Sequence, residues 1–384
     1  MAAHPSHHLL ACLVCAGLVG LLALSGCRTA PNHWNGKTEP FPEAADRPSD
    51  SPDMVRSIKE WEATMASEGR RLGEKLLSLP DASIKNPDGA TLKEVYYDGQ
   101  LVFYQIAEYL GANGAERQRW HAYAERARDI YVLGYLKPNQ FAAAGYMRFA
   151  HGLYEEWRLT GNEAARQWLI RLRDDPPYSS PSQDSNWHLH KYSREIAYAI
   201  QANVLAEKAG EPRQAERVNA LIEMALGHVR IWTTGDYLDG DPEWHFVQAF
   251  MAGLTASALI DYHDHTPDKR IPPAMKTLAD WLWDTMWVPS VEGSGYGAFK
   301  YVNRMVENVG GPEPAPDLNL LIAPLYAWLY REFGDPVYRD RADRIFVGGV
   351  ALTRPDNGKR FNQNYRSSFS YLRWRQQGLQ RWQP

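Results

Sequence analysis

Residues 253–260 read Gly253-Leu254-Thr255-Ala256-Ser257-Ala258-Leu259-Ile260 and are small or apolar at almost every position. A surface helix keeps one polar face, whereas a helix that is apolar nearly all round has neighbours on both sides. This stretch therefore predicts a helix enclosed by other helices. Runs that alternate Val, Ile or Thr with polar residues are few elsewhere, so the chain is predicted to be all-α.

Turns that end a helix recur along the chain, about 50 residues apart at first and more widely before the last. Each has Gly or Pro where a helix should stop, and a polar residue or Pro where the next should start. This spacing is the size of a helical hairpin with its loops. The turns are Gly111-Ala112-Asn113-Gly114, Thr160-Gly161-Asn162, Ala209-Gly210-Glu211-Pro212, Thr266-Pro267-Asp268 and Phe333-Gly334-Asp335-Pro336.

An apolar, aromatic helix precedes each turn, and a more charged helix follows it. The preceding, inner helices are predicted at residues 95–110, 145–159, 191–208, 244–265 and 317–332. The following, outer helices are predicted at residues 115–133, 163–173, 213–232, 271–287 and 337–346. A sixth inner helix at 362–375 and an early helix at 53–79 complete the pairs.

Six inner helices surrounded by six outer ones form an (α/α)6 toroid, which we predict as a single domain over residues 53–384. In this architecture the chain resembles the carbohydrate-active enzymes of that fold, which include alginate-lyase-like polysaccharide lyases and unsaturated glucuronyl hydrolases. The resemblance covers nearly all of the chain after the leader. It implies an activity on glycans through the fold rather than through one specific motif.

The beginning of the chain is typical of an exported protein. An apolar run over residues 9–24 leads into Ser25, Gly26 and Cys27, and its length fits a signal-peptide core better than a membrane span. The sequence Leu24-Ser25-Gly26-Cys27 resembles the lipobox of bacterial lipoproteins. We therefore expect a signal peptide at residues 1–26 and a lipid on Cys27. Arg28, which directly follows that cysteine, favours an outer-membrane location. An uncleaved anchor helix is the alternative.

Residues 27–52 are rich in Pro, Asn, Asp and Glu and are predicted to be a flexible tether. All three cysteines, Cys12, Cys15 and Cys27, lie in the leader or at the lipidation point, so the domain has no thiolate for catalysis or metal binding. The net charge is -4 without a basic run, which argues against nucleic acid as a partner. The expected partners are an acidic polysaccharide and, through the lipid, a membrane.

The chemistry is expected where the inner helices begin, because helix N-termini favour anionic ligands. Polar and aromatic residues gather at these predicted starts. Catalytic candidates are His188, His190, Tyr192 and Arg194. Substrate-binding candidates are Asn186, Trp187, Arg148, His151, Trp244, His245, Asn362, Asn364, Tyr365 and Arg366.

Two reactions compete for this site. Beta-elimination on a uronate needs a group that neutralises the carboxylate, a base for the C5 proton and an acid for the leaving oxygen. Alginate-lyase-like enzymes use Asn, His, Arg and Tyr for these tasks, and the resemblance implies similar roles for Asn186, His188 or His190, Tyr192 and Arg194. A polysaccharide lyase is therefore our first prediction.

Glycoside hydrolysis instead needs two carboxyl groups that flank the bond. Asp98, Glu243 and Asp317 are the alternative acids for that reaction. A glycan-binding lipoprotein without activity is the third reading. The chain has no HExxH motif, Gly-rich phosphate loop or GxSxG elbow, so we predict no metal and no cofactor.

The longest gap between predicted helices, residues 288–316, contains several glycines and aromatic residues. Glycines permit movement and aromatic rings stack on sugars, so this segment is expected to form a lid over the site. A plain insertion is the alternative. In the lid reading, deletion of residues 291–312 weakens glycan binding and leaves the melting temperature nearly unchanged.

Cys27→Ser tests the export prediction, because the thiol is the point of lipid attachment. We expect the variant protein to leave the membrane fraction or to remain unprocessed, as followed by cell fractionation and mass spectrometry. A Cys27→Ser protein that matures and fractionates like the wild type would rule out a lipoprotein.

Overall fold

The computed structural model describes residues 50–174, 190–237 and 245–382, and most of these residues lie in helices. These residues contain two strands, each two residues long. The predicted all-α class is therefore confirmed. The described residues all belong to one compact unit. None of the helices in the described ranges is both long and apolar enough to cross a membrane.

The elements follow one another as α-helices with short 3-10 turns between them. The α-helices are α1 (Pro52–Leu77), α2 (Asp81–Lys85), α3 (Gly89–Val95), α4 (Gly99–Tyr109), α5 (Gly114–Tyr131), α6 (His151–Thr160), α7 (Glu163–Asp174), α8 (Ser193–Lys208), α9 (Ala215–Thr234), α10 (Ala249–His265), α11 (Ile271–Met286), α12 (Asn319–Phe333), α13 (Pro336–Leu352) and α14 (Gly358–Trp382). A π-helical turn (Val132–Leu136) extends α5, and the 3-10 turns are Gly145–Met147, His190–Tyr192 and Pro316–Leu318.

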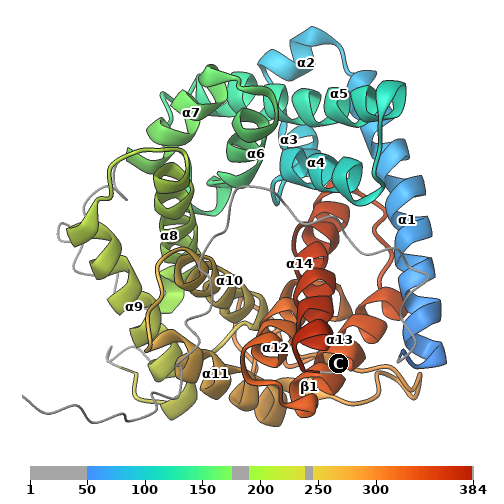
Figure 1. Ribbon diagram of the computed structural model, residues 1–384, viewed down its shortest axis with the longest axis vertical. Helices are drawn as coiled ribbons and strands as arrows, with labels where there is room; N and C mark the ends of the chain where they lie inside the picture. Colours follow the sequence, from blue (N-terminus) through green and yellow to red (C-terminus); the bar gives the residue numbers. More distant parts are fainter. Residues whose placement is uncertain (1–49, 175–189, 238–244, 383–384) are drawn as a thin grey trace, which may run out of the picture. The chain divides into compact units, whose positions relative to one another are not determined.

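Contacts among six of these helices form a closed series. Helix α4 contacts α6, and the series continues through α8, α10, α12 and α14 back to α4. A second set packs against the first, with α5 on α4, α7 on α6, α9 on α8, α11 on α10 and α13 on α12. Helix α1 contacts α5, α13 and α14. Figure 1 shows α14 beside α4, although they are distant in sequence.

The two sets of helices differ in burial as their sequences predict. Helix α10 buries residues around most of its circumference, including Gly253, Leu254, Ala256 and Leu259. A Cβ atom on Gly253 would lie 2.5 Å from the Leu321 side chain, so α10 and α12 approach too closely for a larger residue. Helix α5 instead buries one face, as an outer helix should.

The predicted turns end the helices where the sequence indicates. At the last turn Gly334 adopts φ +70°, and its N–H donates to the Tyr330 carbonyl oxygen at 2.9 Å. The Asp335 side chain then accepts from the Val337 N–H at 3.0 Å, and Pro336 is the first residue of α13. Glycine at a left-handed C-cap followed by an N-cap and proline is an efficient way to reverse the chain.

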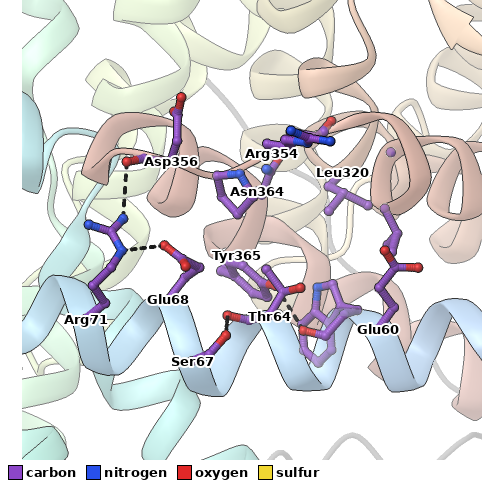
Figure 2. A pocket seen from close by; sticks show the side chains of 15 residues that line it. Glu60, Thr64, Ser67, Glu68, Arg71, Leu320, Arg354, Asp356, Asn364 and Tyr365 are labelled. Atoms are coloured by element: carbon purple, nitrogen blue, oxygen red, sulfur yellow. Dashed lines mark hydrogen bonds and ion pairs between the residues drawn. The ribbon is translucent and has the colours of Figure 1, made fainter.

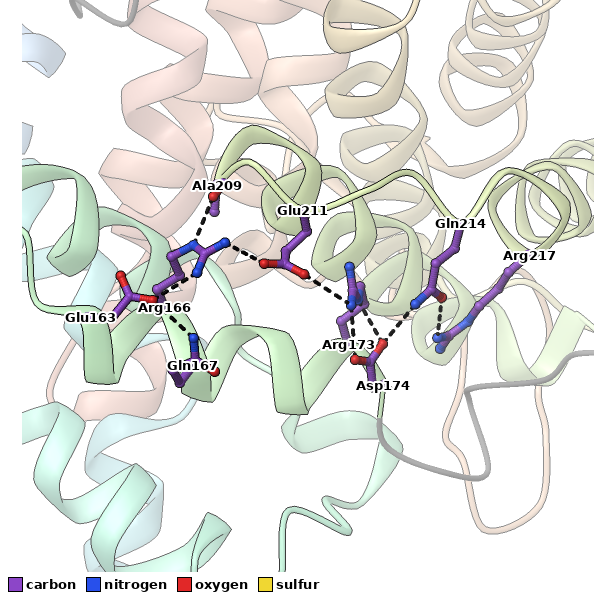
Figure 3. A network of polar contacts seen from close by, with 9 residues as sticks. All are labelled: Glu163, Arg166, Gln167, Arg173, Asp174, Ala209, Glu211, Gln214 and Arg217. Atoms are coloured by element: carbon purple, nitrogen blue, oxygen red, sulfur yellow. Dashed lines mark hydrogen bonds and ion pairs between the residues drawn. The ribbon is translucent and has the colours of Figure 1, made fainter.

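Outer helices α7 and α9 are joined to the α8–α9 turn by a network of charged side chains (Figure 3). Arg166 donates to the Ala209 carbonyl oxygen at 2.9 Å and pairs with Glu211. Gln214 donates to Asp174 at 2.9 Å, and Asp174 pairs with Arg173 at 2.8 Å. Such partly exposed pairs contribute little individually, but together they orient α7 against the start of α9.

Residues 287–318 are tied to the helices around them rather than detached from them. Strand β1 (Trp287–Val288) pairs antiparallel with β2 (Ala298–Phe299), and the Ala249 N–H of α10 donates to the Tyr301 carbonyl at 3.2 Å. A Cβ atom on Gly348 of α13 would overlap the Gly297 carbonyl oxygen. The segment is therefore an integral part of the packed fold. This argues against the expectation that residues 291–312 can be deleted without loss of stability.

Asn319, which is fully buried at the start of α12, connects that segment to the helices. Its amide nitrogen donates to the Gly297 carbonyl at 3.0 Å and to the Ile345 carbonyl at 3.1 Å. Its amide oxygen accepts from the Phe299 N–H at 3.2 Å. One side chain thus satisfies the Gly297 carbonyl and the Phe299 N–H, which would otherwise carry the full cost of desolvation, and adds a second hydrogen bond to a carbonyl inside α13.

Asn319→Ala should lower the free energy of unfolding by about 2–4 kcal/mol, because it leaves those backbone groups without a partner. Urea unfolding followed by circular dichroism measures the change. Asn219→Ala is the matched control, because Asn219 is exposed on α9 and has one long contact of 3.5 Å to Arg213. Equal stability of the two variants would contradict this role of Asn319.

Candidate functional site

The centre of the candidate site is the guanidinium of Arg366 on α14, a residue that is 7% exposed. Its Nη2 donates to the Gln201 amide oxygen of α8 at 3.1 Å and lies 3.5 Å from Nδ1 of His151 on α6. The guanidinium carbon also lies 5.5 Å from the centre of the Tyr198 ring. A buried charge is tolerated when it is compensated in this way.

Asp261 of α10 supplies the opposite charge, although it does not touch Arg366 directly. Its Oδ2 accepts from the Gln201 amide nitrogen at 2.8 Å and lies 3.5 Å from Nε2 of His151. A guanidinium can only donate and a carboxylate can only accept, so Gln201 and His151 bridge the two charges. Nε2 of His151 faces the carboxylate and Nδ1 faces the guanidinium.

Burial raises the pKa of the Asp261 carboxyl, but the contact with His151 and the charges of His151 and Lys208 outweigh it. The hydrogen bond from Gln201 adds to this effect, so the net pKa lies below the ordinary value of 3.8. Asp261 is therefore a carboxylate in the folded protein, and the polar cluster of His151, Gln201, Asp261 and Arg366 carries balanced charges.

A second cation, Arg194, lies at the start of α8 among aromatic rings. Its Nη2 pairs with Glu195 at 2.8 Å, and its guanidinium carbon lies 5.4 Å from the Tyr146 ring centre. Burial raises the pKa of the nearby Tyr96 phenol, and the charge of Arg194 opposes part of this rise. This cation has one carboxylate partner and an otherwise aromatic environment.

Tyr198 lies one turn along α8 and is 1% exposed. Its hydroxyl is buried and has no hydrogen-bond partner among residues 50–174, 190–237 and 245–382. Burial raises the pKa of this phenol, while the charges of Arg366 and Arg194 lower it in part. A buried hydroxyl without a partner is costly in a folded protein and calls for an explanation.

The predicted residue His190 is buried in a separate aromatic group. Its ring lies 5.1 Å from Tyr237 and 6.4 Å from Phe246. Tyr237 in turn stacks on His245 with ring centres 4.3 Å apart. Tyr192 directly precedes α8 and is half-buried, with the Lys191 ammonium 5.5 Å from its ring centre.

The predicted acid Asp98 holds two helix starts together. Tyr97 and Asp98 both adopt left-handed φ angles, +63° and +64°, which place the carboxylate at the N-terminus of α4. Its Oδ1 accepts from the Leu101 N–H at 3.2 Å and its Oδ2 from the Gly152 N–H at 3.0 Å. Both oxygens therefore serve the backbone. The other acid, Asp317, is half-buried, and its Oδ2 lies 3.5 Å from the Gln363 amide nitrogen.

Other predicted binding residues serve the packing of neighbouring segments. Arg148 is buried and donates to the Leu172 carbonyl at the end of α7. Burial lowers the pKa of Arg217 to about 10, and the charge of Arg148 adds to this effect, so Arg148 lies near α9. Asn362 donates to the carbonyls of Glu94 and Tyr96 at 3.0 and 2.8 Å.

Asn364 and Tyr365 lie beside a different cavity, on the α1 side of α14. The Tyr365 hydroxyl donates to the Trp61 carbonyl at 2.9 Å. The remaining predicted residues lie outside the described part of the chain. These are Asn186, Trp187, His188, Glu243, Trp244 and the lipidation residue Cys27.

The sequence prediction includes His151, Arg194 and Arg366 but not their neighbours Tyr198, Gln201 and Asp261. These neighbours lie inside α8 and α10, whereas the predicted residues lie near helix starts. The available signal was a polar side chain within an otherwise small and apolar helix, because such a residue needs a partner on a neighbouring helix.

Comparison of the chain with protein-family models, with curated proteins and with solved structures finds no match. Across the described ranges, His, Cys, Asp and Glu side chains do not gather in a group of three or more that could hold a metal ion. The site is therefore interpreted from its own geometry.

The lowered pKa of Asp261 predicts how stability depends on pH. The carboxylate contributes stability above the ordinary pKa of 3.8, and this contribution disappears as the pH falls through the lower pKa of the folded state. Asp261→Asn should be less stable than the wild type at pH 7, and the difference should shrink below the ordinary pKa.

Urea unfolding at a series of pH values measures this difference. Asp340→Asn on α13 is the control, because that side chain is 61% exposed and pairs with its neighbour Arg339. The free energy of unfolding of the control should differ little from that of the wild type at every pH. A difference between wild type and Asp261→Asn that widens as the pH falls would contradict the assignment.

Proposed function

We propose that the chain is an exported, lipid-anchored carbohydrate-active enzyme that cleaves a uronate-containing glycan by β-elimination. The reacting site is formed around Arg194, Tyr198 and Arg366. The leader that resembles a lipoprotein signal supports export and attachment through Cys27 at the outer membrane. An acidic polysaccharide is then the substrate class, and no cofactor is required.

We also infer that the helices form an (α/α)6 toroid. The closed series of contacts from α4 through α14 supports the inner set, and α1, α5, α7, α9, α11 and α13 supply the outer set. In such a fold one end of the inner helices is a natural binding site. Residues near the starts of α4, α6 and α8 (Asp98, Tyr146 and Arg194) belong to that end.

The reaction begins with binding of the uronate carboxylate. Arg366 presents one nitrogen to Gln201 and His151, and its other guanidinium nitrogens make no hydrogen bond within the described residues. Arg194 supplies a second positive charge close enough to lower the pKa of Tyr198. Neutralising the carboxylate stabilises the negative charge that develops when the C5 proton leaves.

Tyr198 suits the role of the acid. Burial keeps its phenol protonated, so it can donate a proton to the leaving glycosidic oxygen. In the elimination, a base takes the C5 proton, the electron pair of that C–H bond forms the C4–C5 double bond, and the C4–O bond breaks. Tyr192, which directly precedes α8, is the candidate base, whereas His190 packs in the separate aromatic group beside Tyr237.

The observation that carries the proposal is the unpaired, buried Tyr198 hydroxyl, with the Arg366 guanidinium carbon 5.5 Å from the ring centre. Hydrolysis is less well supported, because it needs two available carboxyl groups. Asp98 accepts from two backbone N–H groups, Glu195 pairs with Arg194, and Asp261 accepts from Gln201. Of the other predicted acids, Glu243 lies outside the described residues, and Asp317 has a long contact of 3.5 Å to Gln363, so Asp317 is one acid that remains for hydrolysis.

The experiment is an assay of the full chain on uronate polysaccharides that follows the ultraviolet absorbance of the unsaturated product. Tyr198→Phe should lower kcat by about 10²–10⁴-fold, as expected for loss of a general acid. Tyr330→Phe is the matched control, because Tyr330 also lies on an inner helix with a buried hydroxyl that lacks a partner in the described residues. Its activity should equal that of the wild type.

Arg366→Lys keeps the charge but loses the planar group, and it should mainly raise KM for the acidic substrate. Hydrolysis of neutral glycosides without an unsaturated product would contradict elimination. Retention of uronate polymers without any turnover would instead indicate a glycan-binding protein.

A further inference from the structure

A cavity of about 470 Å³ lies between α1, the α13–α14 connection and α14. Figure 2 shows Asn364 and Tyr365 of α14 facing Thr64 and Ser67 of α1. Arg366 lies two residues beyond Asn364, and residues two apart on a helix point in different directions. The cavity is therefore distinct from the site around Arg366. Its volume falls within the range of small-molecule pockets, about 300–1,000 Å³.

Asn364 is the unusual member of this cavity. The residue is 3% exposed, and its amide oxygen is buried without a hydrogen-bond partner in the described residues. No hydrogen bond of its side chain is found within those ranges, in contrast to the neighbouring Asn362 and Gln363. Buried amides in folded proteins are nearly always paired, so the unpaired Asn364 amide in the wall of this cavity needs an explanation.

The rest of the wall offers further polar groups. Thr64 and Ser67 supply hydroxyls, and Glu60 and Glu68 supply carboxylates from α1. Arg71 donates to Glu68 at 2.7 Å and to the Asp356 carbonyl at 3.1 Å, which holds α1 against the α13–α14 connection at one end of the cavity. These groups fit the hydroxyls and ring oxygen of a sugar, because each hydroxyl donates one hydrogen bond and accepts others.

The charge of the wall selects among sugars. Arg71 pairs with Glu68 at 2.7 Å and Arg360 pairs with Asp356 at 3.2 Å, which leaves one carboxylate, Glu60, and one guanidinium, Arg354. The wall therefore offers no excess of positive charge for an acidic sugar. In this respect the cavity differs from the site around Arg194 and Arg366.

We propose that this cavity is a second carbohydrate site, which binds a neutral sugar of one or two rings through the Asn364 amide. The amide oxygen accepts from a sugar hydroxyl, and the carboxylates of α1 accept from others. This binding is independent of the proposed elimination reaction. It would hold a neutral part of a glycan on the α1 face of the protein.

The test measures sugar binding to the full chain in a detergent without a sugar head group, by calorimetry and ligand-observed NMR. The probes are glucose, cellobiose and maltose, with glucuronic acid as the acidic counterpart of glucose. We expect at least one neutral probe to bind with a Kd of about 1 mM or tighter, and tighter than glucuronic acid.

Two variants locate the binding. Asn364→Leu removes both hydrogen-bonding groups at similar volume, and Ser67→Trp fills the cavity from the exposed side of α1. Each should weaken binding at least tenfold, about 1.4 kcal/mol. Asn113→Leu is the control, because that residue is exposed and its side chain makes no capping hydrogen bond.

The melting temperature separates a ligand-binding role from a structural one. Asn364→Leu should be at least as stable as the wild type, because the amide it removes has no hydrogen bond within the described residues. Absence of neutral-sugar binding, or binding that neither variant weakens, would overturn the proposal. Neutral-sugar binding that persists in Tyr198→Phe would separate this cavity from the reaction site, whether or not elimination is observed.

Discussion

The positive charge of a guanidinium that is buried among helices needs hydrogen-bond acceptors and an opposite charge nearby. In this protein the groups that serve Arg366 link four helices. Gln201 and His151 bridge it to Asp261, so α6, α8, α10 and α14 meet in one polar cluster. Leaving the buried guanidinium without these partners would be costly, so the cluster favours this arrangement of the four helices. The remaining guanidinium nitrogens of Arg366 make no hydrogen bond within the described residues.

Helix α14 shows how one segment serves several purposes through its periodicity. Asn362 secures residues 94–96 ahead of α4, and Tyr365 packs on Trp61 of α1. Asn364 faces the cavity beside α1, while Arg366 enters the cluster with α8. The polar residues that look like one binding group in the sequence are therefore distributed over different sides of the helix.

The sequence predicts the helices well because their ends depend on local chemistry. Glycine in the left-handed conformation, followed by a polar cap or proline, marks helix ends such as Gly334 whatever the rest of the fold does. The burial of α10 follows in the same way from its small and apolar composition.

The site is only partly predictable, because partners across helices are not visible in one sequence. Asp98 and Arg194 look equally suitable at their helix starts, yet Asp98 is occupied by backbone N–H groups and Arg194 lies among aromatic rings. Tyr198 was missed because its importance depends on two arginines, one of which is distant in sequence. The role of residues 287–318 likewise depends on Asn319, whose three hydrogen bonds exist only in the folded chain.

The most direct test of the central claim is a crystal structure of the Tyr198→Phe protein with a uronate oligosaccharide bound. The account predicts a sugar carboxylate within hydrogen-bond distance of Arg366 or Arg194, with the glycosidic oxygen facing the position of the lost Tyr198 hydroxyl. A glycosidic bond located between two carboxylate side chains, or an oligosaccharide bound away from both arginines, would contradict it.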